Sequence, residues 1–371
     1  MESLKKKIEE IILDREDSRD FSLAALLSIT SGMYGQITRL RQFSYRKNLA
    51  KARSLPCTVI SIGNITLGGT GKTPMTIYLA ELLNRLGSKV VILSRGYRGE
   101  AEKRGGLVTD GKKLFMTPNQ AGDEPFMMAG ILRDVPIFVG SNRVKNGRIA
   151  MKKFQPDVIL LDDGFQHFQL KRDIDLVLLD HANPFGNGRL LPRGPLREPV
   201  NALARGDAFI MTRSDYSSDN LPNLLKDKIK RKPIFYTRHI PYICYVLRGN
   251  ATYSMEPDFI RGKKGFAFSG IAKNSDFRDS LKSFPFALTG FSEFPDHHQY
   301  KEKEIASVGR KATKQKADFL VTTEKDFSRI GHAKDWPLPL VVIGIKISFG
   351  DQTSGFEQFI TQKLVKDSRE K

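Results

Sequence analysis

The stretch that decides the fold is CTVISIGNITLGGTGKTPMTIYLAELLNRLG, residues 57–87. Its apolar opening, Cys57–Ile62, predicts a buried strand. Thr73–Leu86 predicts a helix, which Gly87 ends in the C-terminal capping position. A glycine-rich turn that closes on Gly-Lys-Thr joins the two, and this order of strand, turn and helix is typical of a phosphate-binding loop.

The residues of this turn have a direct use in binding phosphate. Glycines let backbone N–H groups turn toward phosphate oxygens, and the helix N-terminus adds a positive dipole. Lys72 would reach the β- and γ-phosphates, and the hydroxyl of Thr73 would bind Mg²⁺. Thr66 stands where the general motif has its first glycine. The predicted phosphate-binding residues are Gly68, Gly69, Thr70, Gly71, Lys72 and Thr73.

Short apolar runs alternate with helical patterns on either side of the turn. Helical patterns at Pro125–Leu132 and Val144–Phe154 separate several of these runs. Strand and helix in alternation predict an α/β domain with a mostly parallel sheet covered on both faces. The further strand candidates are Val90–Leu93, Val135–Val139, Val158–Leu161, Ile174–Leu179 and Ala208–Met211.

A second, smaller α/β block follows a lysine-rich segment at 222–233. Ile234–Leu247 is rich in aromatic and β-branched residues, which favours an extended strand or ribbon. The second block has strand candidates at Gly265–Phe268, Phe319–Thr322 and Leu340–Ile347, and a helix candidate at Lys303–Lys316. We therefore divide the chain into an N-terminal segment 1–55, a phosphate-loop domain 56–232, a linker 233–262 and a C-terminal domain 263–371.

The N-terminal segment changes character along its length. Residues 1–20 carry mixed charge and predict a short solvated helix, whereas Phe21–Thr38 carries no charge. This uncharged run contains an apolar stripe at helical spacing. Several basic residues come directly after the run. The run contains too many polar residues to span a bilayer. Two interpretations remain: an interfacial helix on anionic headgroups, or an amphipathic helix packed on its own domain. The stripe is Leu26, Ile29, Met33, Ile37 and Leu40, and the basic residues are Arg39, Arg41, Arg46, Lys47, Lys51 and Arg53.

Composition narrows the classes of partner. The 371 residues carry a formal net charge of +19, which implies an anionic partner such as a nucleotide, a nucleic acid or an anionic membrane. The two cysteines, Cys57 and Cys244, are far apart in the sequence. They exclude a disulfide framework and a cysteine-ligated zinc site.

Acidic residues follow the apolar run at Val158–Leu161. A phosphate-binding loop predicts a carboxylate at the end of a nearby strand, and Asp162 and Asp163 supply two. We expect them to hold the metal beside the phosphates. Gln166 and His167 continue the same loop, where they could orient a nucleophile or contact phosphate.

Several further polar residues are candidates that spacing alone does not decide. Asp123 precedes a short helix and could simply cap it, and Asp296-His297-His298 could supply a proton-abstracting group. Arg95 follows the Val90–Leu93 strand. The segment 186–199 is too rich in glycine and proline for a regular element and predicts a functional loop, whose arginines could hold an anionic substrate.

Taken together, seven segments resemble the tetraacyldisaccharide 4′-kinase family of lipid A biosynthesis. They occur in the family's order over roughly residues 55–330, and Thr66 is usual in that family. The segments are GNITLGGTGKTP (63–74), SRGY (94–97), GDEP (122–125), DDGFQH (162–167), GNGRLLPRGPLREP (186–199), FPDHH (294–298) and TEKD (323–326).

The resemblance implies a specific activity and architecture. The family transfers the γ-phosphoryl group of ATP to the 4′-hydroxyl of tetraacyldisaccharide 1-phosphate, with Mg²⁺, and makes lipid IV-A. Its fold is a P-loop α/β/α domain joined by a two-stranded β-ribbon to a smaller α/β/α domain. Its members work on the cytoplasmic face of the bacterial inner membrane, which favours the interfacial interpretation of residues 21–53. The basic charge then needs no nucleic acid, and no obligate protein partner is evident.

The resemblance also implies residue roles. Lys72 and Thr73 bind phosphates and Mg²⁺, and Asp162 and Asp163 serve the metal and nucleotide site. Asp123 is the implied base, with His297 paired to it and raising its effective basicity; His297 is an inference over the adjacent His298. TEKD is expected near the nucleotide. The remaining assignments are Arg95 as catalytic, Gln166 as nucleotide-binding, Glu198 as a metal ligand, and Arg143, His167 and Arg197 as substrate-binding.

Two other classes of protein stay open at this point. A P-loop switch or assembly ATPase or GTPase would fit the basic charge, but the chain has no N-K-x-D guanine motif and no RNA-recognition or helix-turn-helix signature. Such a protein would hydrolyse nucleotide slowly without any lipid. A soluble small-molecule kinase would differ mainly in the N-terminal segment.

Overall fold

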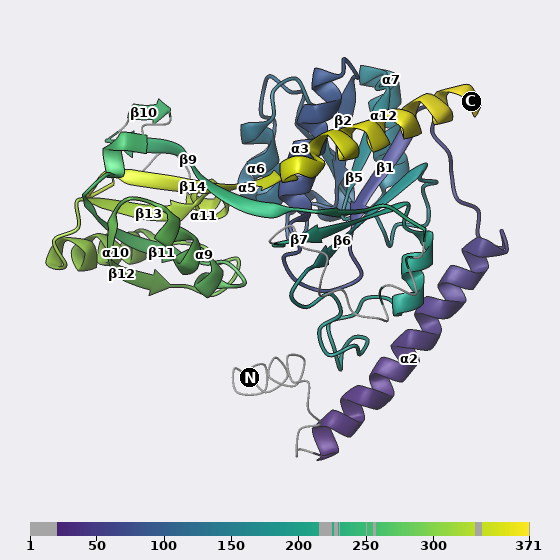
Figure 1. Cartoon of the computed structure of the whole chain (residues 1–371), viewed down its shortest axis with the longest axis horizontal. Helices are drawn as coiled ribbons and strands as arrows, with labels where there is room; N and C mark the ends of the chain where they lie inside the picture. The colour runs from purple at the N-terminus through teal and green to yellow at the C-terminus, as the bar shows by residue number, and fades with distance from the viewer. Residues whose placement is uncertain are drawn as a thin grey trace.

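A computed structural model shows the chain folded into two lobes, each built on its own β-sheet (Figure 1). It describes residues 21–370 apart from 215–224, 226–228, 230, 250, 255, 256 and 331–335. The helix expected within 1–20 and most of the lysine-rich segment 222–233 therefore lie outside the described residues.

The first lobe contains an eight-stranded sheet in the order β3-β4-β2-β5-β1-β6-β7-β8. All neighbouring strands are parallel except β3 and β4, which confirms the mostly parallel sheet expected from the sequence. Every strand predicted for this block is present; β3 and β8 were not predicted as separate strands. The strands are β1 (Thr58–Gly63), β2 (Val90–Ser94), β3 (Gly106–Thr109), β4 (Ile137–Val139), β5 (Val158–Asp162), β6 (Ile174–Asp180), β7 (Ala208–Thr212) and β8 (Ile234–Tyr236).

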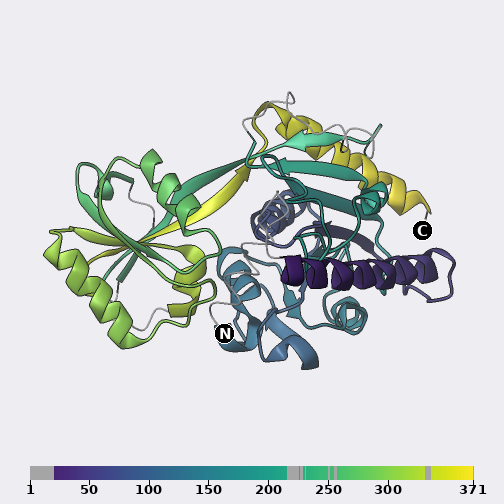
Figure 2. The same ribbon diagram turned by 90° about the horizontal axis from the view of Figure 1, so that it is seen from below.

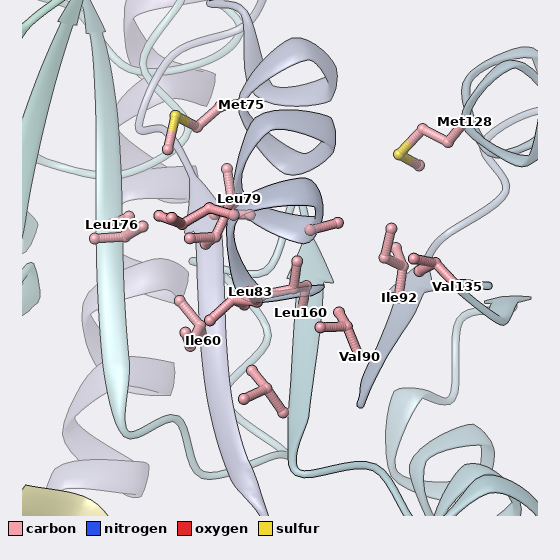
Figure 3. Packing of buried hydrophobic residues seen from close by; sticks show 14 of the residues in the cluster. Ile60, Met75, Leu79, Leu83, Val90, Ile92, Met128, Val135, Leu160 and Leu176 are labelled. Carbon is pink, nitrogen blue, oxygen red and sulfur yellow. The ribbon is translucent and has the colours of Figure 1, made fainter. Parts of the chain in front are cut away.

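The helix after the phosphate loop, α3, packs across the middle of this sheet. Its Met75, Leu79 and Leu83 are fully buried and share one core cluster with the sheet residues Ile60 and Leu160 (Figure 3). Burying such side chains contributes about 1.5–3 kcal/mol each, so this contact fixes the helix against β1 and β5. The helices and 3₁₀ turn of this lobe are α3 (Lys72–Arg85), α4 (Ala101–Arg104), α5 (Pro118–Ala121), α6 (Asp123–Ile131), α7 (Arg143–Phe154) and η1 (Val200–Arg205).

The second lobe contains a six-stranded sheet in the order β10-β9-β14-β13-β11-β12. Its strands β11 to β14 pair in parallel, and β9 and β10 run antiparallel at one edge. The strands are β9 (Arg238–Arg248), β10 (Ala251–Ser254), β11 (Lys264–Ser269), β12 (Ala287–Glu293), β13 (Phe319–Thr323) and β14 (Leu340–Ser348). The helices are η2 (Pro257–Ile260), α9 (Asn274–Ser280), η3 (Leu281–Ser283), α10 (Glu302–Lys314) and α11 (Glu324–Ile330).

The two lobes are joined by a ribbon that corrects the predicted boundaries. Strands β9 and β14 pair antiparallel from Arg238 opposite Ser348 to Leu247 opposite Leu340. The segment 233–262 therefore supplies only one strand of the ribbon, and its first residues form β8 at the edge of the first sheet. The second strand comes from far along the chain, a pairing that local patterning does not reveal.

The second lobe does not extend to residue 371, as the predicted domain 263–371 had it. After β14 and the turn η4 (Gly350–Gln352), the chain returns to the first lobe as α12 (Thr353–Glu370), drawn in yellow in Figure 1. The apolar residues Phe349, Phe356 and Ile360 enter the core cluster that contains α3. Burial of these side chains against the first lobe explains why this helix does not belong with the second.

A long helix, α2 (Phe21–Arg46), lies along the first lobe (Figures 1 and 2). One face packs inward: Leu27 and Ser31 are buried, and Ser31 donates to the carbonyl of Leu190 at 2.8 Å. The predicted apolar stripe faces away, with side chains 57–67% exposed from Leu26 to Leu40. The stripe is therefore not the surface that packs on the domain. No helix within the described ranges is long and apolar enough to cross a bilayer.

Candidate active site

The phosphate loop lies between β1 and α3, at the carboxyl end of the central strand. Gly68 and Gly71 have φ angles of +105° and +81°, the left-handed region that only glycine enters without strain. Lys72 begins α3, and its side chain is only 12% exposed. The loop therefore has the backbone that a phosphate cradle requires.

The side chain of Asn64 stabilises the conformation of the phosphate loop. Its buried side chain donates to the hydroxyl of Thr70 at 2.9 Å and accepts from Lys72 Nζ at 3.3 Å. Gln166, the predicted nucleotide ligand, donates to the backbone carbonyl of Asn64 at 2.8 Å. Both amides act on the loop itself, and the sequence analysis had not singled out Asn64.

Asp162 and Asp163 lie where β5 ends, beside the loop. Asp162 is buried and accepts hydrogen bonds from Ser94 at 2.9 Å and Thr76 at 3.4 Å. Burial raises the pKa of Asp162 to about 7, and the negative charges of Glu124 and Asp163 add to the effect. This surplus of negative charge is what a divalent cation would neutralise.

Asp163 is held by cations. Arg197 Nη1 contacts its two carboxylate oxygens at 2.9 and 2.8 Å, and Lys72 Nζ lies 3.6 Å away. Burial alone would raise the pKa of Asp163, but Lys72 and Arg197 lower it to about 2. The predicted substrate residue Arg197 therefore contacts the predicted metal residue Asp163 in this structure.

The residues fit Mg²⁺ held jointly with nucleotide phosphates. Within the described parts of the chain, no group of three or more His, Cys, Asp or Glu side chains could hold a metal by itself. Mg²⁺ in nucleotide sites needs only one or two carboxylates, because phosphates and water complete its shell. Asp162 and Asp163 supply these, and the buried Thr73 lies in the first turn of α3.

Glu198, the third carboxylate predicted to bind the metal, contacts other side chains in this structure. It is buried, and its two oxygens pair with the guanidinium of Arg205 at 2.8 and 3.1 Å. Gln42 of α2 also donates to it. In this structure the carboxylate of Glu198 joins α2 and η1 to the loop 186–199, and its role as a metal ligand stays a prediction.

Arg143, His167 and Arg95 are the remaining predicted residues of the first lobe. Arg143 is buried at the start of α7; burial lowers its pKa, while Asp163 and Asp162 oppose that shift. Burial and nearby guanidinium groups, Arg143 first among them, lower the pKa of His167 to about 3, so it is neutral at pH 7. Arg95 is 55% exposed and pairs with Glu102 at 2.6 Å. It contacts neither Asp123 nor the phosphate loop.

The loop 186–199 docks directly on the phosphate loop. Leu67 N–H donates to the carbonyl of Pro195 and Arg197 N–H to that of Ile65, both at 2.7 Å. Tyr34 of α2 donates to the carbonyl of Arg197 at 2.9 Å. The helix α2, the substrate loop and the phosphate loop thus form one continuous hydrogen-bonded unit.

Asp123 lies at the start of α6 and reaches across to the second lobe. Its Oδ2 atom contacts His297 Nδ1 at 2.7 Å and Arg329 Nε at 2.7 Å. His298 instead contacts Glu304 of its own lobe at 3.0 Å. The expected contact between Asp123 and His297 rather than His298 is therefore present.

The electrostatics of Asp123 differ from the expectation. Burial would raise its pKa, but hydrogen bonds from His297 and the charge of Arg329 hold the pKa below its ordinary value. The partners thus lower the basicity of this carboxylate rather than raise it. Asp123 is ionised at neutral pH and can accept a proton only weakly.

Arg329 is a site residue that the sequence analysis missed. Its side chain is fully buried on α11 and also contacts Asp326 at 3.1 Å and the carbonyl of Gly270 at 2.9 Å. Asp326 belongs to the TEKD segment and holds Arg329 in place; the expected position of this segment near the nucleotide stays a prediction. The signal available was an arginine three residues after the TEKD aspartate, a spacing that places both on one helix face.

Both lobes therefore contribute to one site. Glu124, next to Asp123, is the acidic residue with the largest effect on the pKa of Asp162, and it lies 3.5 Å from Lys325 of the second lobe. A phosphate loop with strand-end carboxylates, facing a carboxylate–histidine pair, defines a P-loop phosphotransferase.

Comparison with known proteins identifies the family. A family model described as tetraacyldisaccharide-1-P 4′-kinase matches residues 23–365, and the chain belongs to this family. A tetraacyldisaccharide 4′-kinase of Desulfatibacillum aliphaticivorans is 40% identical, over 98% of this chain and 99% of the relative. One of Syntrophus aciditrophicus is 38% identical, over 94% and 95%.

A solved structure agrees with the fold. LpxK from Aquifex aeolicus, crystallised in complex with ATP, aligns with a TM-score of 0.73 and 30% sequence identity. The alignment covers 92% of this chain and 99% of that chain. The two-lobed architecture expected from the resemblance is thereby confirmed, and ATP with Mg²⁺ are the cofactors that the family and its phosphate loop imply.

Proposed function

We propose that this chain transfers the γ-phosphoryl group of ATP to the 4′-hydroxyl of tetraacyldisaccharide 1-phosphate, giving lipid IV-A. The observation that carries the proposal is the meeting of Asp123 with His297 and Arg329 beside the strand-end carboxylates. A hydrolytic switch has no need of a second lobe that brings a base candidate to the γ-phosphate. A kinase needs that group for the acceptor hydroxyl.

The residues divide the work of phosphoryl transfer. Lys72 offsets charge on the β- and γ-phosphates, and Asp162, Asp163 and Thr73 hold Mg²⁺, which supplies charge neutralisation when bound. Asp123 Oδ2 is occupied by His297 and Arg329, so Oδ1 accepts the proton of the attacking hydroxyl. A weakly basic carboxylate suffices, because the loose transition state demands little proton removal before the phosphoryl group moves.

The loop 186–199 and α2 are the proposed lipid side of the site. Three side chains bind anionic groups of the substrate. Arg197 and Arg143 interact with Asp163, and His167 is close to Arg143. The exposed stripe of α2 and its basic C-terminal end make the peripheral contact with an anionic membrane, at the cytoplasmic face of the inner membrane. Acyl chains can then stay in the bilayer, since extracting them costs about 0.8 kcal/mol per CH₂.

Transfer of label tests this proposal. γ-Labelled ATP and tetraacyldisaccharide 1-phosphate in mixed micelles should yield a labelled, bis-phosphorylated lipid with the parent protein. Asp162→Asn should abolish the product. Asp157→Asn is the matched control, because Asp157 precedes the opposite end of the same strand and accepts from Lys89 N–H. Lipid-independent release of phosphate without labelled lipid would overturn the proposal in favour of a switch or assembly NTPase.

A further inference from the structure

The phosphate loop has a neighbour that none of the assigned roles includes. Arg213 follows β7, and its Nη2 donates to the backbone carbonyl of Gly69 at 2.7 Å. Its Nη1 donates to Asp180, which ends β6. Arg213 has a φ of +55°, a left-handed backbone that is uncommon for a residue other than glycine. Such strained positions tend to occur where a side chain must be aimed at a functional site.

The contact with Gly69 determines the orientation of one peptide in the loop. In a trans peptide the carbonyl and the following N–H point in opposite directions. Arg213 holds the Gly69 carbonyl on its own side, so the N–H of Thr70 points away from Arg213. That N–H donates to the carbonyl of Gly68 at 3.2 Å, a long bond that a phosphate oxygen can replace.

Arg213 also reaches the second lobe. Its Nη2 lies 3.9 Å from Asp276 Oδ2 on α9, while the Arg213 side chain is 30% exposed and that of Asp276 is 45% exposed. A second contact joins the same regions: a Cβ added to Gly71 would lie 2.7 Å from Nε2 of His239, which stands at the root of the ribbon strand β9. The phosphate loop is therefore in contact with β9 at Gly71, and through Arg213 it is linked to α9.

We propose that Arg213 is a positioning residue for ATP. Its guanidinium fixes the Gly69–Thr70 peptide in the orientation that binds phosphate, and its ion pair with Asp276 links that peptide to the lobe that carries His297 and Arg329. Asp180 holds the guanidinium in place. The inference rests on ATP binding at the loop, and it does not depend on which acceptor is phosphorylated.

ATP binding without lipid tests the first part. The full-length Arg213→Gln variant should bind MgATP about tenfold more weakly in a calorimetric titration, the usual effect of losing a hydrogen bond from a charged group. Arg213→Lys should give an intermediate affinity, because it keeps the charge but lacks the two separate nitrogens with which Arg213 contacts Gly69 and Asp180. Arg278→Gln on α9 is the matched control, since Arg278 pairs with Glu293 in the same lobe, away from the loop.

Steady-state kinetics separate positioning from a purely structural role. Arg213→Gln should raise KM for ATP and leave KM for the lipid unchanged. A lowered melting temperature with parent-like ATP affinity and KM would overturn the proposal. If Arg213→Gln does not fold, Asp180→Asn releases the guanidinium without removing it. That variant should also bind ATP more weakly, and parent-like affinity there would contradict the proposal.

A double-mutant cycle tests the link to the second lobe. Asp276→Asn alone should weaken ATP binding about twofold, a small effect because the ion pair is exposed. In the Arg213→Gln background it should have no further effect, whereas independent residues would add. Asp279→Asn, which loses an exposed pair with Lys282 on the same side of the lobe, should change nothing. No effect of Asp276→Asn, or additive effects, would disprove the link.

Discussion

The two ends of the site are built in different ways. The nucleotide end consists of the phosphate loop with Asp162 and Asp163, all from one lobe and most from one stretch of sequence. The acceptor end consists of Asp123, His297 and Arg329, which meet only because two lobes come together. A local motif sets the geometry of the first, and tertiary packing sets that of the second. Binding of ATP and transfer of its phosphate should therefore be separable by mutation.

The largest effect should come from the nucleotide end. Lys72→Ala should lower kcat/KM by about a thousandfold, as expected when a group that stabilises transferring charge is lost. It should also weaken ATP binding, measured by titration without lipid. Lys89→Ala is the control, because Lys89 lies just before the first residue of β2, at the end of that strand away from the phosphate loop. A loss of less than tenfold would remove Lys72 from the proposed charge neutralisation.

The Asp123→Asn substitution should impair the acceptor end of the site and leave the nucleotide end intact. Without a proton acceptor, kcat should fall by about a hundredfold or more. ATP binding should stay at the parent level, because Asp123 belongs to the acceptor end. Both quantities can be measured on one preparation, with Asp279→Asn as an exposed carboxylate control in the second lobe. Equal losses in binding and turnover would mean that the two ends are not separable.

The pH dependence of kcat/KM tests the role of Asp123 at the acceptor end. His297 and Arg329 hold the pKa of Asp123 below its ordinary value against the effect of burial, so the parent should lose activity through this group only below the usual carboxyl range. A base must be ionised, so activity falls as pH drops through its pKa. Arg329→Gln should raise the pKa and move the acid limb of kcat/KM to higher pH. The melting temperature should fall as well, because Asp326 loses a buried partner.

The profile of Arg278→Gln provides the reference for that shift, since it removes an exposed arginine from the same lobe. An acid limb in Arg329→Gln that coincides with the parent would show that another group sets the pH dependence.

The smallest effect should come from the lipid side. Replacing Leu26, Ile29 and Met33 by serine removes exposed apolar surface from α2 without touching the face that packs. Activity on anionic vesicles should fall several-fold, while activity on micellar substrate and the melting temperature stay nearly unchanged. Leu86→Ser with Leu114→Ser removes similarly exposed apolar side chains elsewhere and should affect neither assay. Equal activity of the stripe variant on vesicles would contradict membrane docking by α2.

The same contrast explains what the sequence could predict. The strand, turn and helix around Lys72 are encoded within some thirty residues, so hydrophobic periodicity and glycine spacing suffice. The contact of Asp123 with His297 came only from the family resemblance. Arg329 was missed because its role depends on α11 being packed against α6, and nothing in its own segment indicates that contact.

The domain boundaries show the same limit. The ribbon needs β14 as the partner of β9, and α12 needs the core of the first lobe to bury Phe356 and Ile360. Local patterns identified Leu340–Ile347 as a strand but could not assign its partner. The contacts of Glu198 show a related limit: Arg205 lies only seven residues along the chain, but Gln42 approaches from α2, which is distant in sequence.

The most direct test of the central claim is whether ATP consumption depends on the lipid acceptor. Loss of ATP should be followed with and without tetraacyldisaccharide 1-phosphate, and the phosphorylated position in the product assigned by NMR. We predict that consumption requires the lipid and that one new phosphate monoester forms at the 4′ position. Equal consumption without lipid, with phosphate released to water, would contradict the claim that the acceptor end completes a kinase site.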